Sequence, residues 1–93
     1  MAITFALLVN VLHEIEDKMK FIREIDRILK PEGKIAIIEW EREKMEMGPP
    51  VDHRIGKEEV FSILNDLGFE ISNPIKFAGM FYGLIAIKAK NNM

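Results

Sequence analysis

The segment KPEGKIAIIEW, residues 30–40, decides the fold class of this chain. Lys34–Trp40 is a nearly unbroken apolar run, which is typical of a strand covered on both faces in a parallel sheet. Pro31 disfavours helical geometry in the residue before it, so a preceding helix must end near Lys30. Lys30–Gly33 has proline and glycine at positions that favour a β-turn. A helix, a turn and a buried strand in this order indicate an α/β protein.

The same kinds of signal lie on both sides of this segment. Ile3–Val9 is a second apolar run and predicts the first strand. The helix between the two strands has apolar residues three and four apart, with Asp17 as its N-cap. A second amphipathic helix is expected over Lys57–Leu67, with Gly68 as its C-terminal stop. These elements give two β-α units in succession.

Two more strands are expected near the end of the chain, at residues 69–77 and 81–89. A short turn around Gly79 would make them an antiparallel hairpin. The predicted order is therefore β-α-β-α-β-β, in one domain over residues 1–93, with a mostly parallel sheet that ends in this hairpin.

This order leaves part of the sheet uncovered. Right-handed crossovers that step the same way along a sheet place both helices on one face. No third helix is predicted to cover the other face, and the strand at residues 3–9 lacks a partner on one side. An exposed apolar edge pairs readily with another chain. We therefore expect part of a larger domain, or a homodimer formed through edge strand 3–9 or through the bare sheet face.

Composition limits the possible functions. With 48% hydrophobic and 30% charged residues, the 93-residue chain is expected to be globular and soluble. The net charge of -2, with basic and acidic residues interspersed, gives no sign of a nucleic-acid partner. The absence of cysteine excludes disulfides, thiolate zinc sites and cysteine nucleophiles. The apolar start, residues 1–12, has no basic leading region and is too short to span a membrane, so a cytoplasmic protein without membrane contact is expected.

Three stretches in this order, VLHEIED (residues 11–17), ILKPEGKIAIIEW (28–40) and GPPVDHRI (48–55), give the chain a resemblance to a known family. From Ile3 to Lys88 it resembles the carboxyl-terminal half of class I S-adenosylmethionine-dependent methyltransferases, close to those of ubiquinone and menaquinone biosynthesis. The resemblance implies a partial Rossmann-like sheet, with the four predicted strands equivalent to strands four to seven of the family. The last strand would lie between the second and the third.

The resemblance also implies that the cofactor-binding half is missing. The glycines are at positions 33, 48, 56, 68, 79 and 83, and no two are spaced as Gly-x-Gly. The Gly-rich turn that binds S-adenosylmethionine in the family is therefore absent from this sequence. Glu32 is a second departure, because such enzymes usually have glycine there.

Ligands of open α/β sheets bind beyond the carboxyl ends of the parallel strands. His13 follows the first strand, and His53 lies in the loop after the second, so both histidines are expected on one rim of the sheet. Either could act as a general base if the methyl acceptor must lose a proton. Alternatively, His13 only bonds a backbone carbonyl, and His53 with Arg54 only braces the loop.

The resemblance assigns further roles to residues near these strand ends. Asn10, Val11 and Leu12 would line the cofactor pocket, and the loop that ends at Arg54 would border the substrate. Apart from the resemblance, Trp40 lies at a strand end, where it could stack on a substrate. Asn10 could instead cap a turn, and Trp40 could be buried in the core. No metal site is expected, because His13 and His53 show no ligand spacing. Met45 and Met47 could form an apolar lid or be ordinary loop residues.

The sequence is compatible with two functions. The chain could be methyltransferase-related, acting on a small molecule and binding S-adenosylmethionine weakly or not at all without its missing half. It could instead be a non-enzymatic dimerisation or interaction module derived from a methyltransferase fold.

Overall fold

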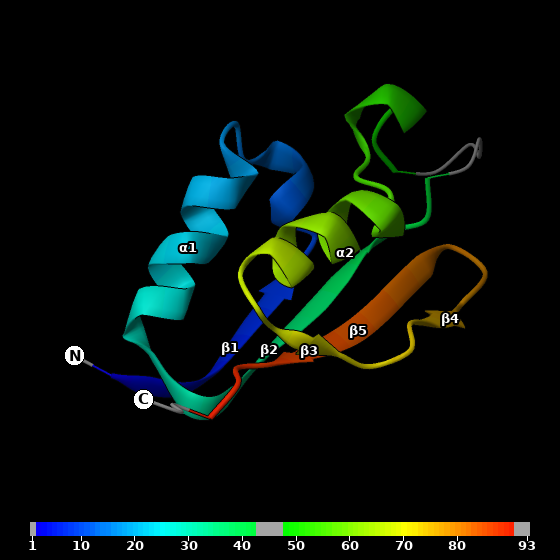
Figure 1. Cartoon of the computed structure of the whole chain (residues 1–93). Helices are drawn as coiled ribbons and strands as arrows, with labels where there is room; N and C mark the ends of the chain where they lie inside the picture. Colours follow the sequence, from blue (N-terminus) through cyan, green and yellow to red (C-terminus); the bar gives the residue numbers. More distant parts are fainter. Residues whose placement is uncertain (1, 43–47, 91–93) are drawn as a thin grey trace.

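The computed structural model describes residues 2–42 and 48–90, which form one layer of strands with helices packed on it (Figure 1). Met45 and Met47 lie outside the described residues. The strands are β1 (Ile3–Val9), β2 (Leu29–Trp40), β3 (Glu70–Ile71), β4 (Ile75–Phe77) and β5 (Phe81–Ile87). The helices are α1 (Lys18–Ile28) and α2 (Lys57–Asp66), with short 3-10 turns η1 (Leu12–Glu14) and η2 (Val51–His53).

The sheet has the order β1-β2-β5-β3, and β4 also pairs with β5. β1 and β2 are parallel, with Leu7 opposite Ala36, whereas β5 runs antiparallel to each of its neighbours. The α/β class is therefore confirmed. A mostly parallel sheet is not, because the β1–β2 pair is the one parallel pairing among the described strands. β5 lies between β2 and β3, the position that the resemblance implies for the last strand.

The β-turn predicted at Lys30–Gly33 is wrong, because these residues lie within β2, which already starts at Leu29. Ile3 pairs with Leu29, but Phe5 pairs with Lys34, so β2 carries extra residues at this point. Glu32 absorbs the irregularity with a left-handed backbone (φ 68°). Such a bulge keeps a strand paired where a turn would interrupt it.

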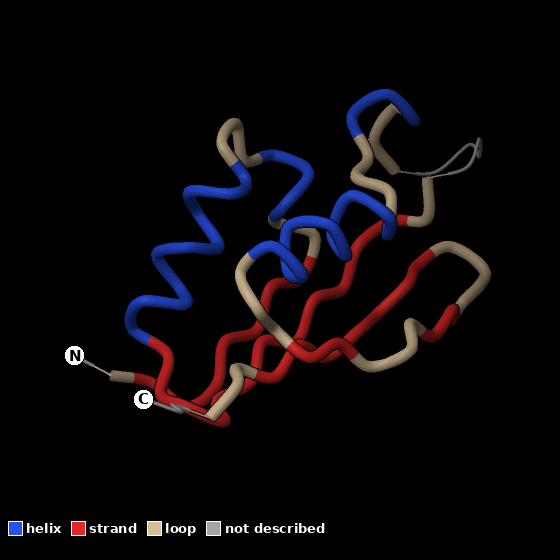
Figure 2. The backbone as a smooth tube through the Cα atoms, viewed as in Figure 1, coloured by secondary structure: helices blue, strands red, loops and turns tan. Residues whose placement is uncertain are grey.

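The third predicted strand, at residues 69–77, is broken into β3 and β4 (Figure 2). Pro74 lies between them and has no backbone N–H to donate to a strand partner. Ser72 bridges the break, since its backbone N–H donates to the carbonyl of Ile85 and its hydroxyl accepts from the N–H of Ile85, both at 2.9 Å. The antiparallel hairpin with β5 is nevertheless present, and its turn contains Gly79 with φ 66°.

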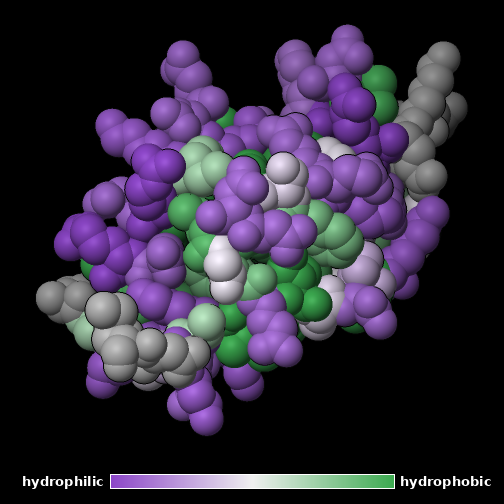
Figure 3. Space-filling view, in the orientation of Figure 1, coloured by the Kyte–Doolittle hydropathy of each residue, from purple (hydrophilic) through white to green (hydrophobic). Residues whose placement is uncertain are grey.

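Both helices lie on one side of the sheet, as predicted (Figure 1). The side chain of Asp17 caps α1 by accepting from the N–H of Lys20 at 3.0 Å. Between the helices and the sheet lies a core of buried residues: Leu8, Leu12, Ile22, Leu29, Ile35, Ile37, Ile55, Val60, Ile63, Leu64, Phe69, Tyr82, Leu84 and Ala86. Hydrophilic side chains dominate the outer surface of the helices (Figure 3).

The opposite face of the sheet has no helix among the described residues. Alternate residues of β1 point to it, and Phe5, Leu7 and Val9 are 52%, 57% and 45% exposed. Ile75 and Phe77 of β4 are exposed too. Apolar runs such as these are typical of strands covered on both faces, whereas no described helix covers this face.

Candidate active site

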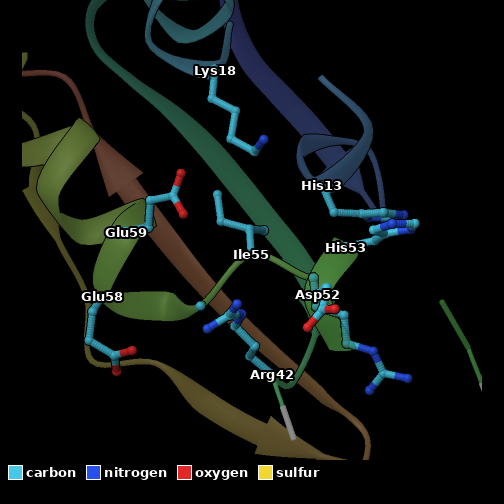
Figure 4. A pocket seen from close by; sticks show the side chains of 10 residues that line it. His13, Lys18, Arg42, Asp52, His53, Ile55, Glu58 and Glu59 are labelled. Atoms are coloured by element: carbon cyan, nitrogen blue, oxygen red, sulfur yellow. The ribbon is translucent and has the colours of Figure 1, made fainter. Parts of the chain in front are cut away.

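A pocket of about 540 Å³ lies beyond the carboxyl ends of β1 and β2 (Figure 4). Its lining comes from η1, the start of α1, the end of β2, η2 and the start of α2: His13, Lys18, Arg42, Asp52, His53, Arg54, Ile55, Gly56, Glu58 and Glu59. The two histidines therefore share one site, as the topology predicted, although 40 positions separate them in the sequence.

His13 is held by Glu39. The Nδ1 atom of His13 lies 2.9 Å from Oε1 of Glu39, and the backbone N–H of His13 donates to Oε2 at 3.2 Å. The side chains of both residues are buried, at 8% and 1% exposure. An ionised carboxylate only accepts, so Nδ1 is the donor to Glu39 and Nε2 is the ring atom left for other partners.

Glu39 is a site residue that was not predicted from the sequence. In β2, Ile35, Ile37 and Glu39 point to the same buried face, toward the helices. A charged residue on the buried face of a strand requires a partner. A glutamate at a buried position of an otherwise apolar strand was the signal in the sequence that could have indicated this site. The sequence alone does not identify His13 as the partner of Glu39.

Arg54 fixes the loop that carries His53. Its side chain donates from Nε to the carbonyl of Pro49 at 2.8 Å and from Nη1 to the carbonyl of Glu41 at 3.1 Å. The guanidinium also lies 5.3 Å from the ring centre of Trp40. Arg54 is buried and lines the pocket, so it both braces the loop and borders the site.

Trp40 does not line the pocket. Its ring packs 4.6 Å, centre to centre, from that of Phe81. Gly48 lies directly against it, since a Cβ added at Gly48 would be 2.9 Å from the indole. Trp40 is thus a half-buried packing residue, and it is not part of the core between helices and sheet where the alternative placed it.

Asn10, Val11 and Leu12 follow β1 but are not part of the pocket lining. Leu12 is in the core. Asn10 has a left-handed backbone (φ 56°) and donates its N–H to the carbonyl of Ile38 at 2.8 Å. Its side-chain Oδ1 is buried and has no hydrogen-bond partner. A buried acceptor without a donor is costly, and this one lies directly after the carboxyl end of β1.

Several polar side chains are buried next to the pocket. The hydroxyl of Tyr82 donates to the carbonyl of Ile55 at 2.7 Å, which fixes the segment between η2 and α2. Burial, reinforced by the nearby charges of Glu39 and Glu41, raises the pKa of the Tyr82 hydroxyl above its usual range. Lys57 donates to Glu41 at 2.9 Å and stands over the Tyr82 ring. Glu41 Oε2 is buried without a partner.

No group of side chains suited to bind a metal ion is found within residues 2–42 and 48–90. In the same part of the chain, no helix is long and apolar enough to cross a membrane.

Comparison with known proteins finds similarity to methyltransferases. Residues 2–37 match the model of a methyltransferase domain. No curated protein matches the sequence. Among solved structures, an S-adenosylmethionine-dependent methyltransferase from Aquifex aeolicus is 29% identical, with a TM-score of 0.86 over 92% of this chain and 46% of its own. A Sulfolobus solfataricus protein described as a type 11 methyltransferase is also 29% identical, with a TM-score of 0.82 over 97% of this chain and 52% of its own.

An O-methyltransferase family protein from Burkholderia thailandensis shares the fold at 15% identity, with a TM-score of 0.75 over 98% of this chain and 32% of its own. The chain thus spans about half the length of the first two solved structures it matches. The resemblance inferred from the sequence is confirmed: this chain has the fold of one part of the S-adenosylmethionine-dependent methyltransferases.

Proposed function

We propose that the chain forms the acceptor side of an S-adenosylmethionine-dependent methyltransferase site for a small molecule, and that it is inactive alone. The observation that carries the proposal is the buried His13–Glu39 pair at the edge of a pocket beyond the parallel strands. Ligands of open α/β sheets bind at this edge.

His13 has the geometry of a general base. Glu39 holds the Nδ1 side of the ring, which orients Nε2 and stabilises the charged imidazolium that forms when Nε2 takes a proton. The Nε2 atom also lies 3.6 Å from Oε1 of the exposed Glu14. This pair suits an acceptor that loses a proton when it is methylated, such as a hydroxyl group or a protonated amine. His53, exposed on η2, is the alternative base, and Arg54 remains the proposed substrate contact.

S-adenosylmethionine would supply a methyl group activated on a sulfonium. The unpartnered Oδ1 of Asn10 fits such a cofactor, because it can accept from an ammonium or a hydroxyl donor. We propose Asn10 with its neighbours Val11 and Leu12 as the cofactor-side edge of this chain. The sequence has no Gly-x-Gly turn to hold the rest of the cofactor, which supports weak or no binding by the chain alone.

A chimera tests the proposal directly. The part of the Aquifex aeolicus methyltransferase that this chain does not match would be joined to residues 2–90, and binding of S-adenosylmethionine would be measured by calorimetry. We expect the folded chimera to bind, and Asn10→Ala to weaken binding more than Asn65→Ala, an exposed position on α2. A folded chimera that does not bind the cofactor would overturn the proposal.

The second candidate is an interaction module. The bare, apolar sheet face and the free edge of β1 favour it, because large exposed apolar patches mark interaction sites. Either function is compatible with a cytoplasmic protein, which we propose from the lack of cysteine and the composition.

A further inference from the structure

Two apolar features occupy opposite edges of the bare sheet face. The first, which we name the β1 stripe, consists of Phe5, Leu7 and Val9, each about half exposed. The second, the β4 groove, is a hollow of about 300 Å³ whose lining is mostly apolar: Ala36, Ile37, Ile38, Ser72, Asn73, Ile75, Phe77, Gly83, Leu84 and Ile85. β1 is the last strand on one side of the sheet, and β4 lies beyond β5 on the other.

The β4 groove exists because Gly83 has no side chain. A Cβ at Gly83 would lie 3.3 Å from the Phe77 ring and would fill the floor of the groove. The Phe77 ring is in turn stacked against Phe81, with 5.6 Å between ring centres. Ile75, 65% exposed, forms the outer wall. The groove is therefore a built hollow with an apolar rim, of a size that accepts aliphatic side chains.

The strand register places Leu7 and Val9 of the stripe on rows that reach the groove, whereas Phe5 lies on the row of Lys34, Ile87 and Glu70. Val9 pairs with Ile38, Ile38 with Gly83, and Gly83 with Ile75. Val9 and Ile75 thus end a single row that crosses the whole face. A two-fold rotation about an axis along the strands exchanges the two edges and keeps each row at its own level. It would place Val9 of one copy over Ile75 of the other.

We propose that the chain forms a two-fold dimer in which Leu7 and Val9 of the β1 stripe of each copy fill the β4 groove of the other. The two sheets would pack face to face at about 10 Å, as in other sheet sandwiches. Such an interface is isologous and closes on itself, so it gives a dimer and not a fibre.

The exposed apolar area on this face approaches what a stable dimer needs. With about 150–250 Å² for a whole aromatic side chain and somewhat less for an aliphatic one, the five exposed apolar side chains would bury on the order of 900 Å² across two copies. The half-buried Ile38, Ile85 and Ile87 on the same face add to this. The sum approaches the lower end, about 1,200 Å², of stable interfaces.

Charges at the margin of the face are compatible with this arrangement. Lys34 pairs with Ile87, and Ile87 pairs with Glu70, so one acid and one base lie on the row at the far end of the face. The rotation places Phe5 of one copy over Glu70 of the other, and Lys34 over Ile87, one strand away from that glutamate. The interface lies on the face opposite α1 and α2, so it does not rest on the proposed chemistry at His13. A segment completing the methyltransferase fold on this face would compete with the second copy.

Sedimentation of the wild-type chain at micromolar concentration tests the dimer first. We expect a dimer, converted to a folded monomer by Leu7→Lys or by Ile75→Lys. The matched control, Arg23→Glu on the exposed side of α1, should leave the dimer intact. Circular dichroism of each variant shows whether it is folded. A folded wild-type monomer would overturn the proposal.

Cysteine cross-linking then tests the arrangement, and the chain offers a clean background because it has no cysteine. Within one copy, positions 9 and 75 are separated by three strand spacings, or about 14 Å, too far for a disulfide. The variant Val9→Cys with Ile75→Cys should therefore form covalent dimers on oxidation, whereas Val9→Cys alone should not. Cross-linking of the single variant as fast as the double one would contradict the proposed two-fold axis.

Discussion

His13 and Glu39, 26 positions apart in the sequence, form a buried pair in which the carboxylate accepts from both the imidazole and the backbone of the histidine. The pair joins the end of β1 to the end of β2, so it stabilises the rim on which the pocket is built. Its members depend on each other, because a buried charge without its partner is strongly destabilising.

Removing His13 should therefore destabilise the chain. We expect His13→Ala to lower the free energy of unfolding by about 3 kcal/mol, because Glu39 would stay buried without the imidazole and would keep only the backbone N–H of residue 13. His53→Ala is the matched control, since His53 is exposed, and should change stability by less than about 0.5 kcal/mol. Urea denaturation measures both. Equal effects of the two substitutions would show that the His13–Glu39 pair does not hold the rim.

Tyr82 should make the chain sensitive to alkaline pH. Its pKa is raised by burial and by nearby carboxylates, so the folded state favours the neutral hydroxyl. The resulting stability is fully present below the unfolded pKa of about 10 and is lost as the pH rises above it. At pH 7, Tyr82→Phe should lower the free energy of unfolding by about 1 kcal/mol, because it removes the hydrogen bond to Ile55. Between pH 9 and about 11, the free energy of unfolding should fall less for this variant than for the wild-type chain. Parallel pH curves for the two proteins would contradict this assignment.

Lys88 caps the C-terminus of α1. Its Nζ donates to the carbonyls of Asp26 and Leu29 at 2.6 and 2.7 Å and lies 3.4 Å from the Asp26 carboxylate. Lys88→Met should lower the free energy of unfolding by about 1–2 kcal/mol, because these carbonyls lose a charged donor. Lys90→Met removes only an exposed pair with Glu32 and should cost almost nothing. Thermal unfolding distinguishes them, and similar melting temperatures would argue against a capping role for Lys88.

Glu32 and Gly33 should respond in opposite directions to substitution. Glu32 has a left-handed backbone, which favours glycine, so Glu32→Gly should stabilise the chain by up to about 1 kcal/mol. Gly33→Ala should destabilise it, because the added Cβ would come within 2.7 Å of Leu29 and of the Lys30 carbonyl. Denaturation of the two variants checks this. Stabilisation by Gly33→Ala, or a loss with Glu32→Gly, would contradict the bulge at this position.

The sequence predicted those features that depend on local patterns. The bounds of β1 and the Asp17 cap follow from an apolar run and a side chain suited to the first turn, and both are confirmed. The shared position of His13 and His53 followed from topology, because parallel strands end at one rim. The roles of these histidines, and of Asn10, Val11, Leu12, Trp40 and Arg54, stay predictions.

Features that depend on pairing between distant segments were not predictable in the same way. The bulge at Glu32 exists because β2 stays paired with β1, and a local turn signal at Lys30–Gly33 cannot show this. The pairing of Glu39 with His13 depends on three-dimensional position alone. Trp40 packs against Phe81 and Gly48 because the loop returns over it, which no local pattern of the sequence reveals.

Titration of the isolated chain with S-adenosylmethionine tests the central claim most directly, that this chain carries only the acceptor side of a methyltransferase site. Calorimetry of the folded 93-residue chain should show no saturable binding at micromolar cofactor, while the chimera with the unmatched part of the Aquifex aeolicus protein binds under the same conditions. Stoichiometric micromolar binding by the chain alone would contradict the account.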